Sequence, residues 1–367
     1  MKVLLLTTHL EMGGIPIYVV ELARRLKRNG HSPRVASAGG CLEKSLAEEG
    51  IPHLRLPCRT SSELNPKLWL KALPQMVFAV RRERVDLIHA HTRVTQVLAW
   101  GLNALTGVPY VTTCHGLYRS RIGRRLFRCW GRWVMAISEP TLQRLVEHYH
   151  LAPPHQVVLV WNGIDVDRFL QPVENAEVAQ FRQENGLRGE PIIGSIARLS
   201  PVKGLDLLLK AVPSLLEEFP RLQVLLVGEG PARDSLVRLA YELGIAGHVV
   251  LTHSVRDTRV PLSLMQAFVA PAWQEGFGLA IVEAMAAGVP VVVTDSGGPT
   301  HLIEDGRSGF VVPVGDPQAI SGALRRLLRD CVFRSQMAQW ARQRAKERFD
   351  VKREVEEVEA VYARAVA

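Results

Sequence analysis

The stretch Pro271–Ala286 carries the residue types best suited to chemistry. A turn of Gly276, Phe277, Gly278 and Leu279 separates Glu275 from a predicted helix that contains Glu283. Backbone N–H groups at a helix N-terminus bind phosphate, and a carboxylate one turn into that helix could hydrogen-bond ribose hydroxyls. The pattern predicts a nucleotide site. Two carboxylates acting as the acid and base of a hydrolase are the alternative.

Two cations follow an earlier apolar run, Ile192–Ile196, which is predicted to be a buried strand. Arg198 and Lys203 lie just beyond its carboxyl end, where open parallel sheets bind their ligands. An arginine fork and a lysine point charge together suit a diphosphate. The same sequence also fits two solvated cations on a surface loop that bind no ligand, so both interpretations stay open.

A second candidate anion site follows the first apolar run of the chain. Gly13 and Gly14 permit close backbone approach, and Pro16 suits the first turn of a helix, where its missing N–H costs nothing. The N–H groups at this helix start could bind an anion. Taken alone, the two glycines are better explained by a tight turn with no ligand.

Short apolar runs that alternate with amphipathic stretches must position these residues. Buried strands are predicted at Val3–Thr7, Val35–Ala38, Leu87–Ala90, Tyr110–Thr113, Val134–Ile137, Val157–Val160, Ile192–Ile196, Val224–Val227, Val249–Thr252, Phe268–Ala270 and Val291–Thr294, with helices such as Tyr18–Lys27 and Pro66–Arg84 between them. This alternation is typical of parallel sheets covered by helices on both faces.

The alternation occurs twice and predicts two doubly wound α/β domains. We expect the first at residues 1–168, a polar linker at 169–190 and the second at 191–349, with a C-terminal helix at 350–367 that could pack back onto the first. The length of 367 residues agrees, because single cores stop growing at about 250–300 residues.

Composition excludes several classes of protein and divides the charge unevenly. Hydrophobic residues make up 47% and charged residues 22%, which excludes intrinsic disorder. The net charge is +9, but residues 1–170 hold 23 basic and 12 acidic residues, whereas 171–367 hold 22 and 24. An anionic partner should therefore meet the N-terminal half first.

The cysteines and apolar runs predict a cytoplasmic location. The five cysteines are scattered and lack CxxC spacing, which argues against a disulfide framework and a zinc site. No run approaches the roughly 18 apolar residues of a membrane span, and the first run is shorter than a secretory signal requires.

Glu275 and Glu283, with seven residues between them in EGFGLAIVEAMAAGVPVV, resemble the EX7E signature of retaining glycosyltransferase family 4. The resemblance covers nearly the whole chain. It includes GG at Gly13–Gly14, HG at His115–Gly116, ISE at Ile137–Glu139, NGID at Asn162–Asp165, AR at Ala197–Arg198, KG at Lys203–Gly204 and GEGP at Gly228–Pro231. It implies the GT-B fold, in which two facing Rossmann-like domains enclose a cleft. It also implies transfer of a sugar from a nucleotide-diphosphate donor to an acceptor hydroxyl, with retention at the anomeric carbon.

The resemblance also implies roles for single residues. Arg198 and Lys203 would neutralise the donor diphosphate, and N–H groups at Gly13–Gly14 and Gly276–Leu279 would complete the anion site. Glu283 would hold the ribose, and Glu275 would approach the ring hydroxyls of the donor sugar. His115 would contact that sugar beside the reacting carbon. Three positions, Pro16, Ala272 and His301, depart from residues common in the family, so the donor is not identified.

Asp165-Val166-Asp167 reads like DxD, the metal motif of another glycosyltransferase fold. It follows Asn162-Gly163 after a predicted strand, as an interdomain element of family 4 does. We therefore expect no metal and no other cofactor.

Arginines crowd the segment Arg119–Arg132. On a helix, Arg121, Arg124, Arg125, Arg128 and Arg132 share one face, opposite Ile122, Leu126, Cys129 and Trp133. Such a helix can lie on an anionic bilayer or hold a phosphorylated acceptor, whereas a domain helix with a solvated charged face is the alternative. The segment predicts a lipid-linked or cell-envelope glycan acceptor, such as lipopolysaccharide, and a peripheral position on the inner face of the membrane. No nucleic-acid recognition motif accompanies the charge.

Two other functions stay open. A sugar-nucleotide 2-epimerase of GT-B fold would bind the same donor and change it without an acceptor. A non-catalytic sugar- or nucleotide-binding protein is the other candidate, although the presence of His115, Arg198, Lys203, Glu275 and Glu283 argues against it.

Overall fold

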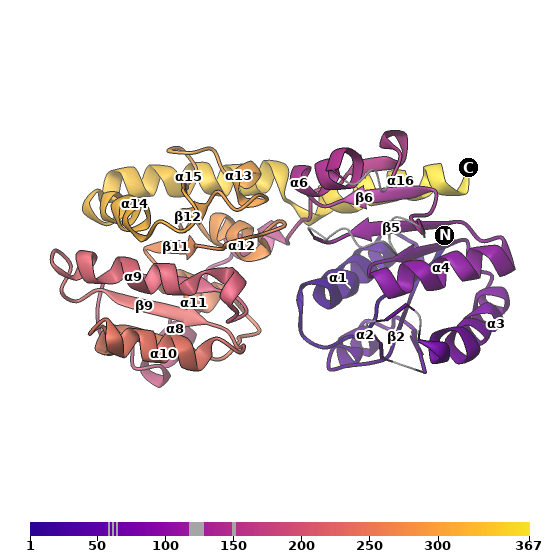
Figure 1. Cartoon of the computed structure of the whole chain (residues 1–367), viewed down its shortest axis with the longest axis horizontal. Coiled ribbons are helices and arrows are strands. Elements are labelled where there is room, and N and C mark those ends of the chain that lie inside the picture. Colours follow the sequence, from indigo (N-terminus) through magenta and orange to yellow (C-terminus); the bar gives the residue numbers. More distant parts are fainter. Residues whose placement is uncertain (58, 61, 64, 117–127, 149–151) are drawn as a thin grey trace. The chain divides into compact units, whose positions relative to one another are not determined.

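The chain forms two units, each built on its own parallel sheet (Figure 1). The computed structural model describes residues 1–57, 59–60, 62–63, 65–116, 128–148 and 152–367. The first unit comprises Met1–Trp161 and Lys352–Ala367, and the second comprises Asn162–Val351. Two doubly wound α/β units are what the repeated alternation of strands and helices predicts.

The first unit contains a sheet in the order β3-β2-β1-β4-β5-β6-β7. Its strands are β1 (Lys2–Leu6), β2 (Ser32–Ser37), β3 (His53–Arg55), β4 (Leu87–Ala90), β5 (Tyr110–Cys114), β6 (Trp133–Ala136) and β7 (Val157–Leu159). Its described helices and helical turns are α1 (Gly14–Arg28), α2 (Glu43–Glu48), η1 (Leu68–Ala72), α3 (Leu73–Glu83), α4 (Arg93–Thr106), α6 (Glu139–Gln143), η2 (Arg144–His148), η3 (Pro154–Gln156) and α16 (Val351–Val366).

The core of the first unit follows from the alternation of side chains along its strands. Leu4 and Leu6 of β1 and Ile88 of β4 face the buried side chains of α3 and α4, and the register pairs Leu4 with Ile88. Buried positions on these helices recur at helical spacing, for example Met76 and Val80 of α3.

The C-terminal helix α16 belongs to the first unit. Its Tyr362 is fully buried there, the Asn29 amide donates to Glu359 at 2.9 Å, and the Arg353 guanidinium donates to the Trp161 carbonyl at 3.1 Å. The last helix of the chain therefore completes the core of the unit that the first strand begins.

The second unit contains a sheet in the order β10-β9-β8-β11-β12-β13. Its strands are β8 (Ile192–Ile196), β9 (Gln223–Val227), β10 (Val249–Thr252), β11 (Ala267–Ala270), β12 (Val291–Thr294) and β13 (Phe310–Val312). Its helices and helical turns are α7 (Val166–Leu170), α8 (Asn175–Glu184), η4 (Pro201–Lys203), α9 (Leu205–Leu216), α10 (Arg233–Glu242), η5 (Ala246–His248), α11 (Arg259–Leu264), α12 (Leu279–Ala287), α13 (Pro299–Leu302), α14 (Pro317–Arg329) and α15 (Cys331–Arg348).

One hydrophobic cluster joins α9, α10 and α14 to the strands of this sheet, through residues such as Leu208, Leu236 and Leu324. Helix α12, which follows the glycine-rich turn, packs against α7, α11 and α15. The start of α12 is thus fixed by helices of its own unit.

The expected boundaries differ from the structure in two places. The stretch 169–190 is not a linker, because it contains α8, which packs against α11 inside the second unit. The first unit ends at Trp161 rather than at 168. Helix α8 buries none of its residues fully, so its composition resembles that of a solvated linker. Among the described residues, no helix is long and apolar enough to cross a membrane.

Candidate active site

In the second unit, three of the predicted site residues lie where the strand order reverses. Strand β8 lies between β9 and β11, so the chain leaves it toward one side and returns on the other. Open parallel sheets bind ligands at such a point, outside the carboxyl ends of the strands. Arg198 and Lys203 follow β8, and Glu275 follows β11.

The Lys203 ammonium and the Glu275 carboxylate form an ion pair with a hydrogen bond. Their side chains are 27% and 18% exposed, so the pair is largely but not fully removed from water. The other carboxylate oxygen of Glu275 accepts from the Gly276 N–H at 3.1 Å. The structure therefore brings together two of the four residues predicted to be catalytic.

Close backbone contacts hold the loops that carry this ion pair. The Trp273 N–H donates to the Val202 carbonyl at 2.9 Å. Gly204 has a φ of +62°, and a Cβ there would lie 2.0 Å from the Pro271 carbonyl oxygen. Only glycine fits this position, so the KG dipeptide is required by the approach of the two loops.

Arg198 lies on the same loop as Lys203. It is exposed and forms no ion pair with any residue in the described ranges. The backbone around it is fixed, because the Ala197 N–H donates to Val227 at 3.0 Å and the Leu199 N–H donates to Glu229 at 2.8 Å. A fixed backbone with an unpaired guanidinium suits the capture of an anion.

The turn before α12 has the geometry expected of an anion site. Gly278 is the N-cap residue, with a φ of +101°, and no side chain caps the helix. The first N–H groups of a helix have no partner within it, so they are directed toward a ligand or water. Phe277 is buried and lies edge-on to Phe349, with ring centroids 5.9 Å apart. Its side chain anchors the turn.

Glu283 has different partners from Glu275. Burial raises the pKa of its carboxyl group to about 7, Asp257 adds to the rise, and a hydrogen bond with Thr258 and the charge of Arg168 oppose it. Within the described residues, Glu283 shares no ion pair with Lys203. The sequence did not reveal Thr258 as its partner, because the two positions are 25 apart in the chain and lie in different elements.

In the first unit, two of the predicted residues follow a strand at the reversal of strand order. Strand β1 lies between β2 and β4, and Gly13 and Gly14 follow it. Gly13 is the N-cap of α1, no side chain caps the helix, and a Cβ at Gly14 would meet no atom within 4 Å. The start of α1 is therefore open to a ligand, but the protein itself does not require glycine at position 14.

His115 follows β5 and belongs to a cluster of histidines. Its Nε2 lies 3.1 Å from Nδ1 of His91, which follows β4, and the ring of Tyr18 lies edge-on to it at 4.7 Å. Burial lowers the pKa of His115 to about 3 and the pKa of His91 well below its ordinary value. His91 and His89 were not among the predicted site residues, although His-Ala-His at the end of a buried strand was a visible signal.

The arginine segment is described only in part, and the DxD-like sequence has a structural role. Residues 117–127 lie outside the described residues, and they include Arg119, Arg121, Arg124 and Arg125. The predicted helix does not extend to the end of the segment, because residues 128–132 are described and are not helical, and Trp133 begins β6. The Arg132 guanidinium donates to the Ala365 carbonyl at 2.7 Å. Asp165 of the DxD-like sequence caps α7, accepting from the Arg168 N–H at 3.2 Å.

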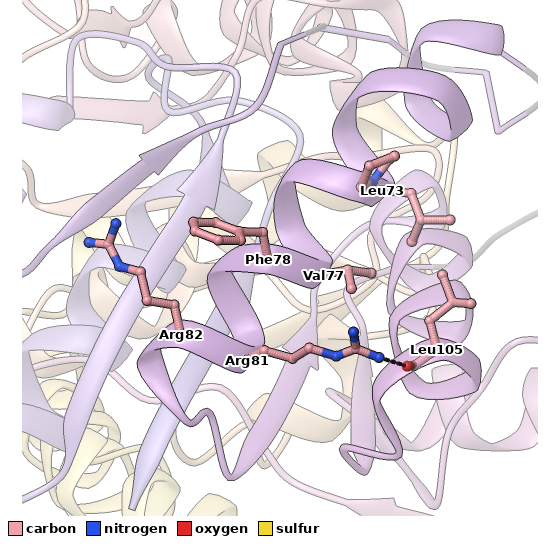
Figure 2. A pocket seen from close by; sticks show the side chains of 7 residues that line it. Leu73, Val77, Phe78, Arg81, Arg82 and Leu105 are labelled. Atoms are coloured by element: carbon pink, nitrogen blue, oxygen red, sulfur yellow. Dashed lines mark hydrogen bonds between the residues drawn. The ribbon is translucent and has the colours of Figure 1, made fainter.

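A surface groove in the first unit contains none of the predicted site residues (Figure 2). It is lined by Leu73, Pro74, Val77, Phe78, Arg81, Arg82 and Leu105, from α3 and α4. Phe78 is 66% exposed, and the Arg81 guanidinium donates to the Leu105 carbonyl at 2.8 Å. The groove is an apolar surface bordered by cations rather than a catalytic site.

Known proteins resemble this chain along both units. Residues 12–168 match the family model described as Glycosyltransferase Family 4, and residues 177–344 match the model described as Glycosyl transferases group 1. The D-inositol 3-phosphate glycosyltransferase of Corynebacterium jeikeium is 30% identical, over 90% of this chain and 87% of that protein.

Two further comparisons concern a mannosyltransferase and a solved structure. The GDP-mannose-dependent alpha-(1-6)-phosphatidylinositol monomannoside mannosyltransferase of Mycolicibacterium smegmatis is 37% identical over 46% of each chain. The crystal structure of Alr3699/HepE from Anabaena, in complex with UDP and glucose, aligns with a TM-score of 0.86 and 23% identity over 99% of both chains.

Proposed function

The chain belongs to glycosyltransferase family 4 and is a GT-B glycosyltransferase; on that premise we propose that it transfers a sugar from a nucleotide-diphosphate donor to an acceptor hydroxyl with retention at the anomeric carbon. The observation that carries the proposal is the Lys203–Glu275 ion pair at the strand reversal of the second unit, with the exposed Arg198 on the same loop as Lys203. Cations and a carboxylate at this point match a sugar diphosphate, which has an anionic end and a hydroxylated end.

The diphosphate is the leaving group in this reaction. The bond from the anomeric carbon to the phosphate oxygen breaks, the acceptor oxygen bonds to that carbon, and the acceptor proton passes to the departing phosphate. Negative charge develops on that phosphate, so Arg198, Lys203 and the N–H groups of Gly276–Leu279 would stabilise the transition state. The N–H groups at Gly13–Gly14 are proposed to complete the anion site.

The sugar and the ribose are assigned to the remaining residues. Glu275, oriented by Lys203, would accept hydrogen bonds from hydroxyls of the donor sugar, and His115 would contact that sugar beside the reacting carbon. Glu283 would hold the ribose. The acceptor attacks the anomeric carbon from the same face that the phosphate leaves. No protein nucleophile is therefore needed on the opposite face of the sugar.

We propose that the reaction needs no metal. The helix cap formed by Asp165 supports this, because it gives one carboxylate of the DxD-like sequence a structural role. EDTA should leave turnover unchanged. An activity that EDTA abolishes and manganese restores would contradict the proposal.

We propose a lipid-linked or cell-envelope glycan as the acceptor, with the enzyme peripheral on an anionic membrane through Arg119–Arg132. The excess of basic residues in the first 170 positions supports this, as do the apolar and basic side chains of the α3–α4 groove. The mycobacterial relative is named for a phosphatidylinositol mannoside substrate. Anionic liposomes should sediment the protein at low salt and release it at high salt. Equal sedimentation with neutral and anionic liposomes would contradict the proposed contact with an anionic membrane.

The donor is tested by thermal shift with UDP-, GDP- and ADP-sugars, because a ligand that binds only the folded state raises its melting temperature. The identified donor is then incubated alone. Slow release of the nucleoside diphosphate supports a transferase, a C2 epimer of the intact donor indicates the epimerase, and an unchanged donor indicates a non-catalytic binding protein.

A further inference from the structure

His91 lies directly behind His115 and is fully buried, whereas His115 is partly exposed. The ring of His91 is held between two neighbours: its centroid is 3.9 Å from that of His89 and 5.6 Å from that of Tyr18. His91 Nδ1 and His115 Nε2 are 3.1 Å apart, so one of the two nitrogens carries a proton and donates a hydrogen bond to the other. The direction of this hydrogen bond decides which nitrogen of His115 carries a proton.

The other nitrogen of His91 determines that direction. Its Nε2 is buried and has no hydrogen-bond partner among the described residues. A neutral imidazole carries one proton, so if His115 donated to Nδ1 of His91, Nε2 of His91 would be a buried N–H with no acceptor. Buried N–H groups without a partner are rarer than buried acceptors without one. The proton therefore belongs on Nδ1 of His91, which donates to Nε2 of His115.

We propose that His91 is a positioning residue that fixes His115 as the Nδ1–H tautomer, so that His115 offers an N–H donor to the transferred sugar. The role in turnover depends on the proposed function, in which His115 contacts that sugar. His115 can then donate to an oxygen of the sugar but cannot accept a proton from it through Nδ1. Burial, which lowers the pKa of both histidines, keeps the two rings neutral and so preserves the single tautomer.

His89 does not share this role, although it is equally buried and lies on β4, two positions before His91. Its Nδ1 lies 2.6 Å from the Tyr362 hydroxyl and its Nε2 lies 2.7 Å from the Thr113 hydroxyl. Both partners can donate or accept, so they do not select a tautomer of His89. His89 contacts the His91 ring but has no hydrogen bond to His115 in the described structure, and it therefore provides a matched control.

The test compares His91→Leu, His91→Asn and His89→Leu with the wild-type protein. Leucine removes the donor, whereas the asparagine amide lies near the position of Nδ1 and can still donate to His115. The tautomer of His115 is read at pH 7 from ¹⁵N–¹H correlation spectra of histidine-labelled protein, with His115→Ala used to assign the signals. We expect the Nδ1–H form in the wild type, in His91→Asn and in His89→Leu, and its loss in His91→Leu.

Turnover of the identified donor is measured on the same variants. We expect kcat to fall roughly 10²-fold in His91→Leu and to recover in His91→Asn. An Nε2–H tautomer in the wild type, or an unchanged tautomer in His91→Leu, would overturn the assignment. A changed tautomer with unchanged kcat would overturn the positioning role. If no nucleotide sugar is turned over by the wild type, the proposed function fails, while the spectra still decide whether His91 sets the tautomer.

Discussion

Replacing Lys203 by alanine separates catalysis from stability, because the structure predicts very different sizes for the two effects. Lys203 is assigned to the donor diphosphate and also pairs with Glu275. Removing one preorganised group that stabilises charge in a transition state lowers turnover by about 10²–10³, or about 2.7–4 kcal/mol. Lys203→Ala and Arg198→Ala should each lose turnover by this factor.

The effect on folding should be much smaller. The side chains of Lys203 and Glu275 are 27% and 18% exposed, and partly solvated ion pairs contribute about 0–1 kcal/mol to stability. A domain stable by about 5–15 kcal/mol remains folded after such a loss. Unfolding therefore cannot account for the lost turnover.

The assay measures kcat with the identified donor and urea unfolding on the same preparations. Lys210→Ala is the matched control, because it breaks an ion pair with Asp206 at 2.9 Å on α9 of the same unit. We expect the control to keep its turnover. Near-normal turnover in both Lys203→Ala and Arg198→Ala would refute the assignment of the diphosphate site. A loss of turnover that follows the loss of stability would refute the argument from charge.

Three further predictions follow from the backbone and the pKa shifts. Gly204→Ala should lower the urea midpoint of unfolding by more than Gly186→Ala. Both glycines have positive φ, but of the two only a Cβ at position 204 meets another atom, the Pro271 carbonyl oxygen at 2.0 Å. Equal shifts of the two midpoints would contradict the close approach. Glu283 has a folded-state pKa of about 7, above its ordinary 4.5, so its contribution to stability is present below pH 4.5 and is lost as the pH rises to 7. The stability of Glu283→Gln relative to the wild type should therefore increase from pH 4.5 to 7 in urea unfolding, and parallel pH profiles would contradict this. The ¹⁵N shifts of His115 should not change between pH 5 and 9, because burial lowers its pKa to about 3; a titration near 6.5 would show that the ring is solvated.

The fold was largely predictable from the sequence, since long apolar runs identify buried parallel strands. All the strands predicted this way are present, including β8 and β11, which precede the loops of Lys203 and Glu275. Strands β3 (His53–Arg55) and β13 (Phe310–Val312) were missed. Strand β3 contains a single apolar residue and so forms no apolar run, whereas the three apolar residues of β13 were a visible signal that was not used. Helix α8 was missed for a related reason, since its apolar residues do not form a continuous face and neighbouring α11 stabilises it.

The site was predictable as a set of loops but not as a set of contacts. Arg198, Lys203 and Glu275 were predicted to follow strands of the second unit, and they lie after β8 and β11. Their pairing could not be predicted, because it depends on β8 and β11 being neighbours in the sheet. The His91–His115 contact depends in the same way on the pairing of β4 with β5. Sequence patterns specify which segments are buried but leave the order of parallel strands open.

The most direct test of retaining sugar transfer is an early ¹H NMR spectrum of the identified α-linked donor incubated with the protein. We predict that the nucleoside diphosphate is released and that the α-anomer of the sugar, free or bonded to an added acceptor, appears first. The signals should be absent with the Lys203→Ala/Arg198→Ala double variant. The β-anomer appearing first, a C2 epimer of the intact donor, or a donor left unchanged by the wild-type protein would contradict the account.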